Sequence, residues 1–202
     1  MTTALVRPRV LVDLLPAVWL RDLALVVGGT AAIALSAQVS IPLWFTPVPL
    51  TFQTLAVLAT GAALGTWRSL TSTALYLVAA VAGLPVLAPK EDGGHVTGSA
   101  VFAMPSLGYV LGFIVAGALV GKLAEAGFTR TPLRTASAMV LGNLAIYAIG
   151  VPVLKLVTGA DWASAVSWGL TPFIIGDLIK VAIAAGAFPA AWALVRRINP
   201  AA

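Results

Sequence analysis

Residues 168–195 read WGLTPFIIGDLIKVAIAAGAFPAAWALV, an almost wholly apolar run. The run is long enough to cross a bilayer, because about 20 apolar residues of helix span the hydrocarbon core. Within it lie Asp177 and Lys180, whose charges are expensive inside a membrane unless they are paired or used. Spaced i and i+3 on a helix, the two side chains share one face. The run therefore predicts a spanning helix with a polar point that faces a cavity or a ligand.

The composition extends this interpretation to the whole chain of 202 residues. Hydrophobic residues make up 60% of it and the mean hydropathy is +1.01. Charged residues make up only 9%, against about 25% in soluble domains. Every hydrophilic segment is short, so no second, soluble domain is expected. The fold class predicted is an all-α, multi-pass membrane protein of the cell (plasma or inner) membrane.

Several functional classes find no support in the residues. The chain has no cysteine, which excludes disulfides and thiolate metal sites. A lone histidine in a Gly-rich connector, His95, predicts no metal centre. The basic residues that give the net charge of +5 lie mainly at the ends of predicted helices, where they set the membrane topology. No nucleic-acid partner is therefore expected. The nearest match to a phosphate loop, GALVGKL at 117–123, has one residue too few between its glycines and Leu after the Lys. We therefore expect neither an enzyme nor a cofactor.

Six spanning helices are expected in one transmembrane domain, residues 23–197. The expected spans are residues 23–41, 50–66, 70–86, 104–123, 135–157 and 168–195. Residues 1–22 are expected to form a cytoplasmic N-terminal segment with an interfacial helix over 8–20. Residues 198–202 are expected to form a C-terminal tail.

Basic residues are divided unevenly between the two sides of such a six-span bundle. One side carries Arg7, Arg9, Arg21, Arg68, Lys122, Arg130, Arg134, Arg196 and Arg197. The other carries only Lys90 and Lys155. Loops rich in Lys and Arg stay in the cytoplasm, so both termini are expected there. The Pro-rich connector at 42–49 and the loop at 87–103 then face outward.

Polar residues inside the spans gather between the outer end and the middle of the bundle, when depth is counted at about 1.5 Å per residue. They are Gln53, Tyr109, Asn143, Asp177 and Lys180. With apolar walls around a few polar groups, the arrangement predicts a substrate-binding pocket that opens outward. Trp44, in the Pro-rich connector, is expected to join the pocket as part of its lid.

Other roles remain open for the same residues. Asp177 and Lys180 are also compatible with a structural ion pair, or with a proton relay, although no further acidic or histidine residues lead across the membrane. Asn143 is equally compatible with a hydrogen bond between helices, and Tyr109 with an aromatic anchor.

Small residues recur at every fourth position on three predicted helices: Ala24, Gly28 and Ala32 on the first, Gly61 and Gly65 on the second, and Gly117 and Gly121 on the fourth. Such stripes let helices approach closely. They predict either packing within this protein or docking of another membrane protein.

Five sequence blocks, taken together, resemble the biotin-binding S-components of energy-coupling-factor (ECF) transporters, the BioY family. In chain order they are PVPLTFQTL at 47–55, GLPV at 83–86, PSLGYVLGF at 105–113, Gly142-Asn143 with Tyr147 and Gly150, and TPFIIGDLIK at 171–180. The resemblance covers most of residues 40–185. It implies a six-helix subunit that captures biotin from outside.

The resemblance also implies partners and roles for particular residues. A transmembrane coupling protein and two ABC-type ATPases are expected to drive release inward. The family's Asp-x-x-Lys motif matches Asp177 and Lys180, which are then ligand-binding. The family's docking stripe matches Ala24, Gly28 and Ala32.

The chain departs from the family pattern in PSLGY, where members often have PTGGY, and in a longer, more charged loop at 88–103. Three other classes stay open from the residues: an ion-coupled carrier that works alone, a purely structural membrane subunit, and an S-component for thiamine or riboflavin.

Overall fold

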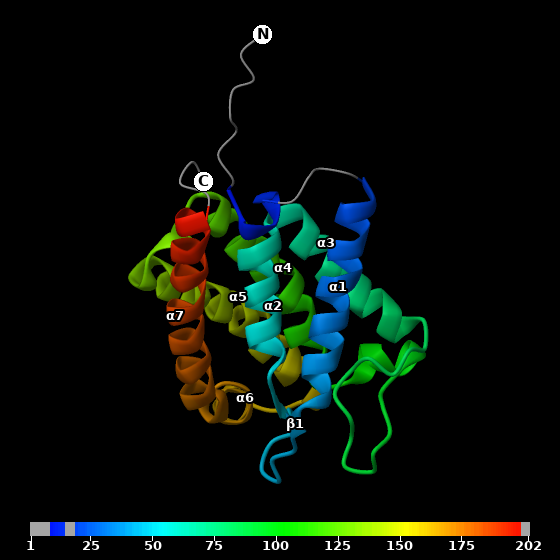
Figure 1. The fold of residues 1–202 in the computed structure, drawn as a ribbon. Coiled ribbons are helices and arrows are strands. Elements are labelled where there is room, and N and C mark those ends of the chain that lie inside the picture. The colour runs from blue at the N-terminus through cyan, green and yellow to red at the C-terminus, as the bar shows by residue number, and fades with distance from the viewer. Residues whose placement is uncertain (1–8, 15–18, 199–202) are drawn as a thin grey trace.

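The computed structural model describes residues 9–14 and 19–198 of the chain. In this part, seven α-helices pack into one bundle, accompanied by short 3-10 helices and one two-stranded hairpin (Figure 1). The elements are η1 Leu11–Leu14, α1 Trp19–Gln38, β1 Ser40–Ile41, β2 Leu50–Thr51, α2 Gln53–Leu64, α3 Thr66–Val81, η2 Gly98–Ala103, α4 Leu107–Glu125, η3 Phe128–Arg130, α5 Pro132–Thr158, α6 Trp162–Gly169, η4 Thr171–Phe173 and α7 Ile174–Ile198.

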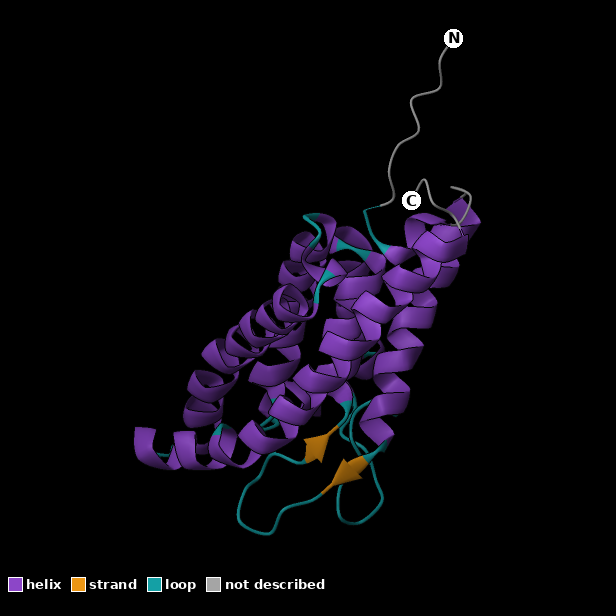
Figure 2. Cartoon of the chain, turned by 60° about the vertical axis from the view of Figure 1, so that its left-hand side comes forward, coloured by secondary structure: helices purple, strands orange, loops and turns teal. Residues whose placement is uncertain are grey.

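The two ends of the bundle differ in their connections. One end, here called the hairpin end, carries β1, β2, α6 and the long loop between α3 and α4 (Figures 1 and 2). The opposite end carries η1 and the last turn of α7 (Figure 1). The described starts and ends of the chain therefore lie together, away from the hairpin.

Within the described part of the chain, four segments are long and apolar enough to cross a membrane: Trp19–Gln38, Leu107–Glu125, Pro132–Thr158 and the combined Trp162–Ile198. The second and third helices are shorter than the spans predicted from the sequence. Helix α2 has 12 residues and α3 has 16. The chain is thus an all-helical membrane protein with four membrane-length apolar segments.

The predicted sixth span is not one helix. The short helix α6 ends at Gly169, and η4 intervenes before α7 begins at Ile174. Pro172 lies in this break, and proline cannot donate the backbone hydrogen bond that would continue a helix. The break moves Asp177 into the first turn of α7. The prediction that residues 168–195 form one continuous spanning helix is therefore wrong.

The centre of the bundle is α4, which packs against α2, α3 and α5. Contact with α2 is close because the glycine stripes of the two helices face each other. A Cβ atom on Gly61 would lie 2.6 Å from the carbonyl oxygen of Gly117, and one on Gly121 would lie 2.5 Å from the carbonyl carbon of Gly65. Gly65 also has a φ of +84°, which allows the tight turn from α2 to α3. These two stripes serve packing within the protein.

The small-residue stripe of α1 has a different environment. Ala24, Gly28 and Ala32 are all exposed on the surface of the bundle. A Cβ atom on Gly28 would meet nothing within 4 Å, whereas one on the next residue, Gly29, would lie 2.7 Å from Ser72 Oγ of α3. The stripe of α1 is therefore left without a partner helix within the described chain.

The segment before α1 packs onto the bundle. Val10 and Val12 are buried and form a small apolar cluster with Ala124 of α4. Arg68 links this segment to α1 and α3, because its guanidinium lies 3.6 Å from Asp13 and 3.1 Å from Asp22. Part of the interfacial helix predicted over 8–20 lies outside the described residues, as do residues 1–8 and the tail at 199–202.

Candidate functional site

A cavity of about 360 Å³ opens among the connections at the hairpin end. Its walls come from the connector at 42–51, the first turn of α2, the loop at 87–96, and parts of α4, α5 and α7. The volume is within the range of about 300–1,000 Å³ that is typical of small-molecule sites. Helix α2 begins only at Gln53. The non-helical connector before it therefore forms part of the cavity wall, in the place that a longer helix would occupy.

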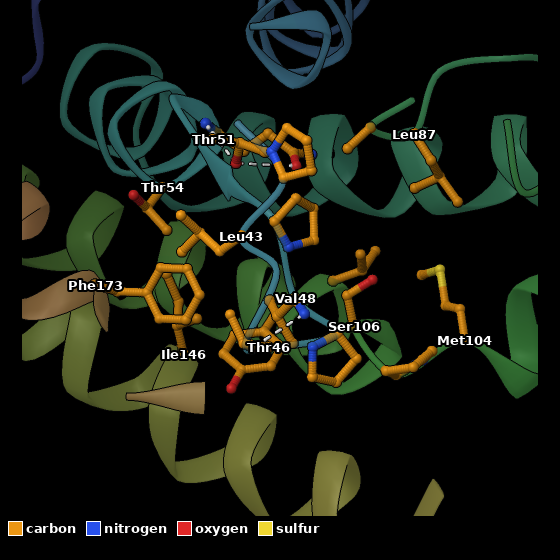
Figure 3. A pocket seen from close by; sticks show the side chains of 18 of the residues that line it. Leu43, Thr46, Val48, Thr51, Thr54, Leu87, Met104, Ser106, Ile146 and Phe173 are labelled. Carbon is orange, nitrogen blue, oxygen red and sulfur yellow. Dashed lines mark hydrogen bonds between the residues drawn. The ribbon is translucent and has the colours of Figure 1, made fainter. Parts of the chain in front are cut away.

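Most of the cavity wall is apolar. Figure 3 shows Leu43, Val48, Ile146 and Phe173 gathered on one side of it, with Leu87 and Met104 on the other. The connector is braced at this point, because Thr46 Oγ1 donates to the carbonyl oxygen of Trp168 at 2.8 Å. Such walls suit an apolar ligand body whose orientation is fixed by few polar contacts.

The charged pair predicted from the sequence forms one polar region of the cavity wall. Lys180 Nζ donates to Asp177 Oδ1 at 3.3 Å and to Thr54 Oγ1 at 2.8 Å. A third hydrogen bond, at 2.8 Å, runs from Lys180 to the carbonyl oxygen of Thr51. Thr54 in turn donates to Asp177 Oδ1 at 3.2 Å, and Tyr147 donates its hydroxyl to Oδ2. Asp177 and Lys180 are only 6% and 9% exposed, so each charge is buried but fully partnered.

The helix directions help to hold this buried carboxylate. Asp177 lies in the first turn of α7, where the helix macrodipole favours a negative charge. The N-terminal ends of α2 and α4 also border the cavity, through Gln53 and Ser106. Three helices therefore present the positive ends of their dipoles to one space.

Two further predicted residues line the cavity, and both are already hydrogen-bonded. Gln53 Nε2 donates to the hydroxyl of Tyr76 at 2.7 Å. The hydroxyl of Tyr109 donates to the carbonyl oxygen of Gly169 at 2.7 Å, which ties α4 to the end of α6. Tyr109 therefore presents mainly its ring to the cavity.

The loop at 87–96 supplies a second charged part of the lining, through Lys90 and Glu91. It is folded as a tight hairpin, with Pro89 bridged to His95. Within the loop, the Gly94 amide and then the Lys90 ammonium hold the pKa of the Asp92 carboxyl below its usual value. The ring nitrogen Nδ1 of His95 lies 2.8 Å from the Leu87 carbonyl oxygen. No group of side chains in the described residues could hold a metal ion.

Two predicted site residues lie away from the cavity wall. Trp44 is 93% exposed, although its neighbour Leu43 faces the cavity. Asn143 is buried, but it borders a separate narrow void next to Lys180. Their roles in binding stay predictions.

The structure adds residues that sequence reasoning did not single out. Thr54 and Tyr147 hold the carboxylate of Asp177, and Thr51 offers its backbone oxygen to Lys180. Tyr147 follows Asn143 by four positions on α5, so the i, i+4 rule for helix faces was a signal that could have found it. The contribution of Thr51 is a backbone atom, which no side-chain pattern reveals.

Comparison with known proteins decides the family. A model of the BioY family matches residues 5–197. The chain belongs to the BioY family. The resemblance inferred from the sequence blocks is thereby confirmed.

Two curated members illustrate how far this BioY-family chain agrees with its relatives. The biotin transporter BioY of Rhizobium etli is 36% identical over 173 residues, which cover 82% of this chain and 89% of that protein. Biotin transporter BioY2 of Lactococcus lactis is 33% identical over 164 residues, covering 80% and 84%. The agreement therefore extends over nearly the whole bundle.

A solved structure agrees in fold as well. The crystal structure of the S-component for biotin from an ECF-type ABC transporter superposes with a TM-score of 0.72 at 26% identity. The superposition covers 90% of this chain and 92% of that one. The overall fold of this chain is therefore similar to that of an S-component for biotin.

Proposed function

We propose that this chain is the biotin-capturing subunit of an ECF-type transporter, and not an enzyme. The observation that carries the proposal is the buried Asp177–Lys180 pair on the wall of a 360 Å³ cavity, in a chain whose relatives are named as biotin transporters. The pair faces a ligand-sized space instead of lipid. This is the arrangement expected of a binding site, where ionisable residues inside a membrane protein are retained for use.

The chemistry of biotin fits such a cavity. Biotin has a neutral ureido head, an apolar bicyclic body and an anionic tail. The carboxylate of Asp177 can accept ureido N–H groups, and the ammonium of Lys180 pairs with it. Hydrogen bonds to ionised groups are about twice as strong as neutral ones. Apolar walls formed by residues such as Phe173 and Ile146 suit the ring system.

The binding residues proposed are Asp177, Lys180, Gln53 and Tyr109, which line the cavity. Thr54 and Tyr147 support them by holding the carboxylate. Trp44 is proposed to join the lid only if its connector moves, since its side chain points away in this structure.

We also propose that the chain crosses the membrane six times, with residues 1–22 and 198–202 in the cytoplasm and residues 23–197 as the transmembrane domain. The crossings are α1 to α5 and α7. α2 and α3 are short, and the outer connectors at 42–52 and 82–106 complete their passage. Among the described residues, η1 and the end of α7 share one end of the bundle (Figure 1), as an even number of crossings requires. The basic residues on that side make it cytoplasmic, so the cavity opens outward.

The energy for release is proposed to come from partners: a transmembrane coupling protein and two ABC-type ATPases. The chain itself has no phosphate loop. The exposed stripe of Ala24, Gly28 and Ala32 on α1 is the proposed docking surface for the coupling protein.

Thermal unfolding of the purified protein with single vitamins tests the assignment. Biotin is expected to raise the melting temperature, because a ligand that binds only the folded state stabilises it. Thiamine and riboflavin should leave it unchanged. A shift with either of those vitamins and none with biotin would transfer the proposal to another S-component. No shift with any vitamin would favour a structural subunit. Uptake driven by an ion gradient, in vesicles with this protein alone, would favour a stand-alone carrier.

Tyr147→Phe is expected to weaken biotin binding about tenfold. The change removes the hydroxyl that donates to Asp177 Oδ2, and a hydrogen bond to a charged group contributes about 1.5–3 kcal/mol. Isothermal titration in detergent measures the effect. Tyr109→Phe is the matched comparison, because its hydroxyl bonds the Gly169 backbone instead of the carboxylate. That variant should lose mainly thermal stability. Unchanged affinity of Tyr147→Phe would remove this residue from the site.

A further inference from the structure

Asn143 of α5 carries a buried acceptor with no hydrogen-bond partner. Its side-chain oxygen Oδ1 is unpaired, and the residue is only 8% exposed. It borders a narrow void where α2, α5 and α7 meet, lined also by Thr54, Leu55, Leu58, Met139, Lys180 and Val181. Apart from Asn143, Thr54 and Lys180, these neighbours are apolar.

An ordered water cannot satisfy this acceptor in the present arrangement. The void has no room for a water-sized sphere, and a bridging water also needs several polar partners. A buried acceptor left unpaired is destabilising, and each such group in a native structure needs an explanation. An apolar residue of similar size would leave no unpaired acceptor among Leu58, Met139 and Val181, so we expect the amide to lower stability.

Besides Asn143, the residues at the void with hydrogen-bond donors on their side chains are Thr54 and Lys180. Thr54 has one hydroxyl proton, which it donates to Asp177, so we take the ammonium of Lys180 as the donor for Asn143. The side chain of Lys180 lines both the binding cavity and the narrow void. All three of its protons are engaged, and the longest of the three hydrogen bonds is the 3.3 Å contact to Asp177 Oδ1. The same carboxylate oxygen also accepts from Thr54. A ligand N–H that donates to Oδ1 therefore competes first with Lys180.

We propose that Asn143 is a positioning residue for Lys180: when a ligand donates to Asp177, the ammonium turns one proton from Oδ1 to Asn143 Oδ1. The inference rests on the proposed function and assigns Asn143 an indirect role instead of a contact with biotin. After this change of partner, the ammonium of Lys180 still makes three hydrogen bonds. One lone pair of Asp177 Oδ1 is then free to accept a hydrogen bond from the ligand. Asn143 then offsets part of the cost of separating the charged pair.

Asn143→Leu is expected to change stability and affinity in opposite directions. Without biotin its melting temperature should rise by about 2–4 °C, because an unpaired acceptor is replaced by an apolar group. Its affinity for biotin should fall about tenfold, because Lys180 loses the acceptor it turns to. Thermal unfolding and isothermal titration measure the two quantities. A lower melting temperature in the absence of biotin would overturn the proposal, since Asn143 would then hold helices together. Asn143→Ala repeats the affinity measurement if the leucine variant does not fold.

Ser69→Ala is the matched control. Ser69 Oγ is likewise buried and unpaired, but it lies on α3 against Gly117 of α4, away from the cavity. Removing it should leave biotin affinity unchanged.

A double-mutant cycle with Lys180→Met separates an action through the lysine from a general packing effect. In the Lys180→Met background, Asn143→Leu should cause no further loss of affinity, because coupled residues are not additive. A further tenfold loss there would overturn the proposal, as would wild-type affinity of Asn143→Leu alone. Both results leave the proposed function standing as long as the wild type binds biotin. If the wild type does not bind biotin, the proposed function fails and the inference fails with it.

Discussion

Replacing Lys180 with alanine is expected to weaken biotin binding about a hundredfold. The ammonium gives the buried Asp177 carboxylate its only opposite charge within hydrogen-bonding distance among the described residues. Thr54 and Tyr147 remain as donors, but a buried charge left without its partner is costly. The ligand also loses the ammonium as a hydrogen-bond donor. Isothermal titration in detergent measures the loss.

Asp177→Asn should lower affinity at least tenfold, since it leaves Lys180 without its charge partner. Breaking a buried pair from one side typically costs about 3–5 kcal/mol, whereas replacing both partners is often neutral. The double variant Asp177→Asn with Lys180→Met should therefore unfold at a higher temperature than either single variant and still fail to bind biotin. Wild-type-like affinity in both single variants would contradict the assignment of the site.

The sequence was sufficient to predict the membrane class and the charged pair, because both depend on penalties whose sign does not change with context. A carboxylate inside an apolar run is costly in any bundle, so Asp177 and Lys180 had to face something polar. The structure shows that they face both each other and the cavity. The structural ion pair and the wall of the proposed binding site, weighed as alternatives from the sequence, are therefore formed by the same two residues.

Helix ends were harder to predict, because hydropathy does not register a break inside an apolar run. Residues 168–195 read as one span, yet Pro172 and η4 divide them. Likewise, the span predicted over residues 50–66 included apolar residues of the neighbouring connector, whereas α2 itself has only 12 residues. In both cases the irregular backbone borders the cavity, which is where non-helical backbone is tolerated at membrane depth.

Side-chain direction was also beyond the sequence. Trp44 and Leu43 are adjacent and both apolar, but only Leu43 faces the cavity. Asn143 lies near Lys180 as depth counting implied, but behind it and not beside the ligand space. Depth along a helix axis places a residue in one dimension only, and the rotation of the helix decides what the side chain meets.

The same limit applies to small-residue stripes, and here it leads to a prediction. The stripes of α2 and α4 pack against each other, while the identical spacing on α1 stays exposed at Ala24, Gly28 and Ala32. Without the structure, no rule distinguishes the two uses. Of the three stripes predicted from the sequence, only that of α1 leaves backbone that an external helix can approach closely.

Gly28→Leu is expected to leave biotin binding intact and to abolish assembly with the coupling protein. A Cβ atom at this position meets nothing within 4 Å, so the isolated subunit accommodates the larger side chain. A partner helix that packs at small-residue distance does not, because leucine holds the two backbones apart. Co-purification of the coupling protein with tagged subunit, beside a biotin titration of the same preparation, measures both effects.

The control is Gly186→Leu, an equivalent change on α7, where the added Cβ also meets nothing within 4 Å. It should affect neither binding nor assembly, because it lies on α7 and outside the proposed docking stripe of α1. Gly29→Leu should instead fail to fold normally, since its Cβ would lie 2.7 Å from Ser72 Oγ. If Gly28→Leu and Gly186→Leu co-purify equally well with the coupling protein, α1 is not the docking surface. Loss of assembly in Gly28→Leu alone, with affinity unchanged, would separate the surface for the partner from the cavity for the vitamin.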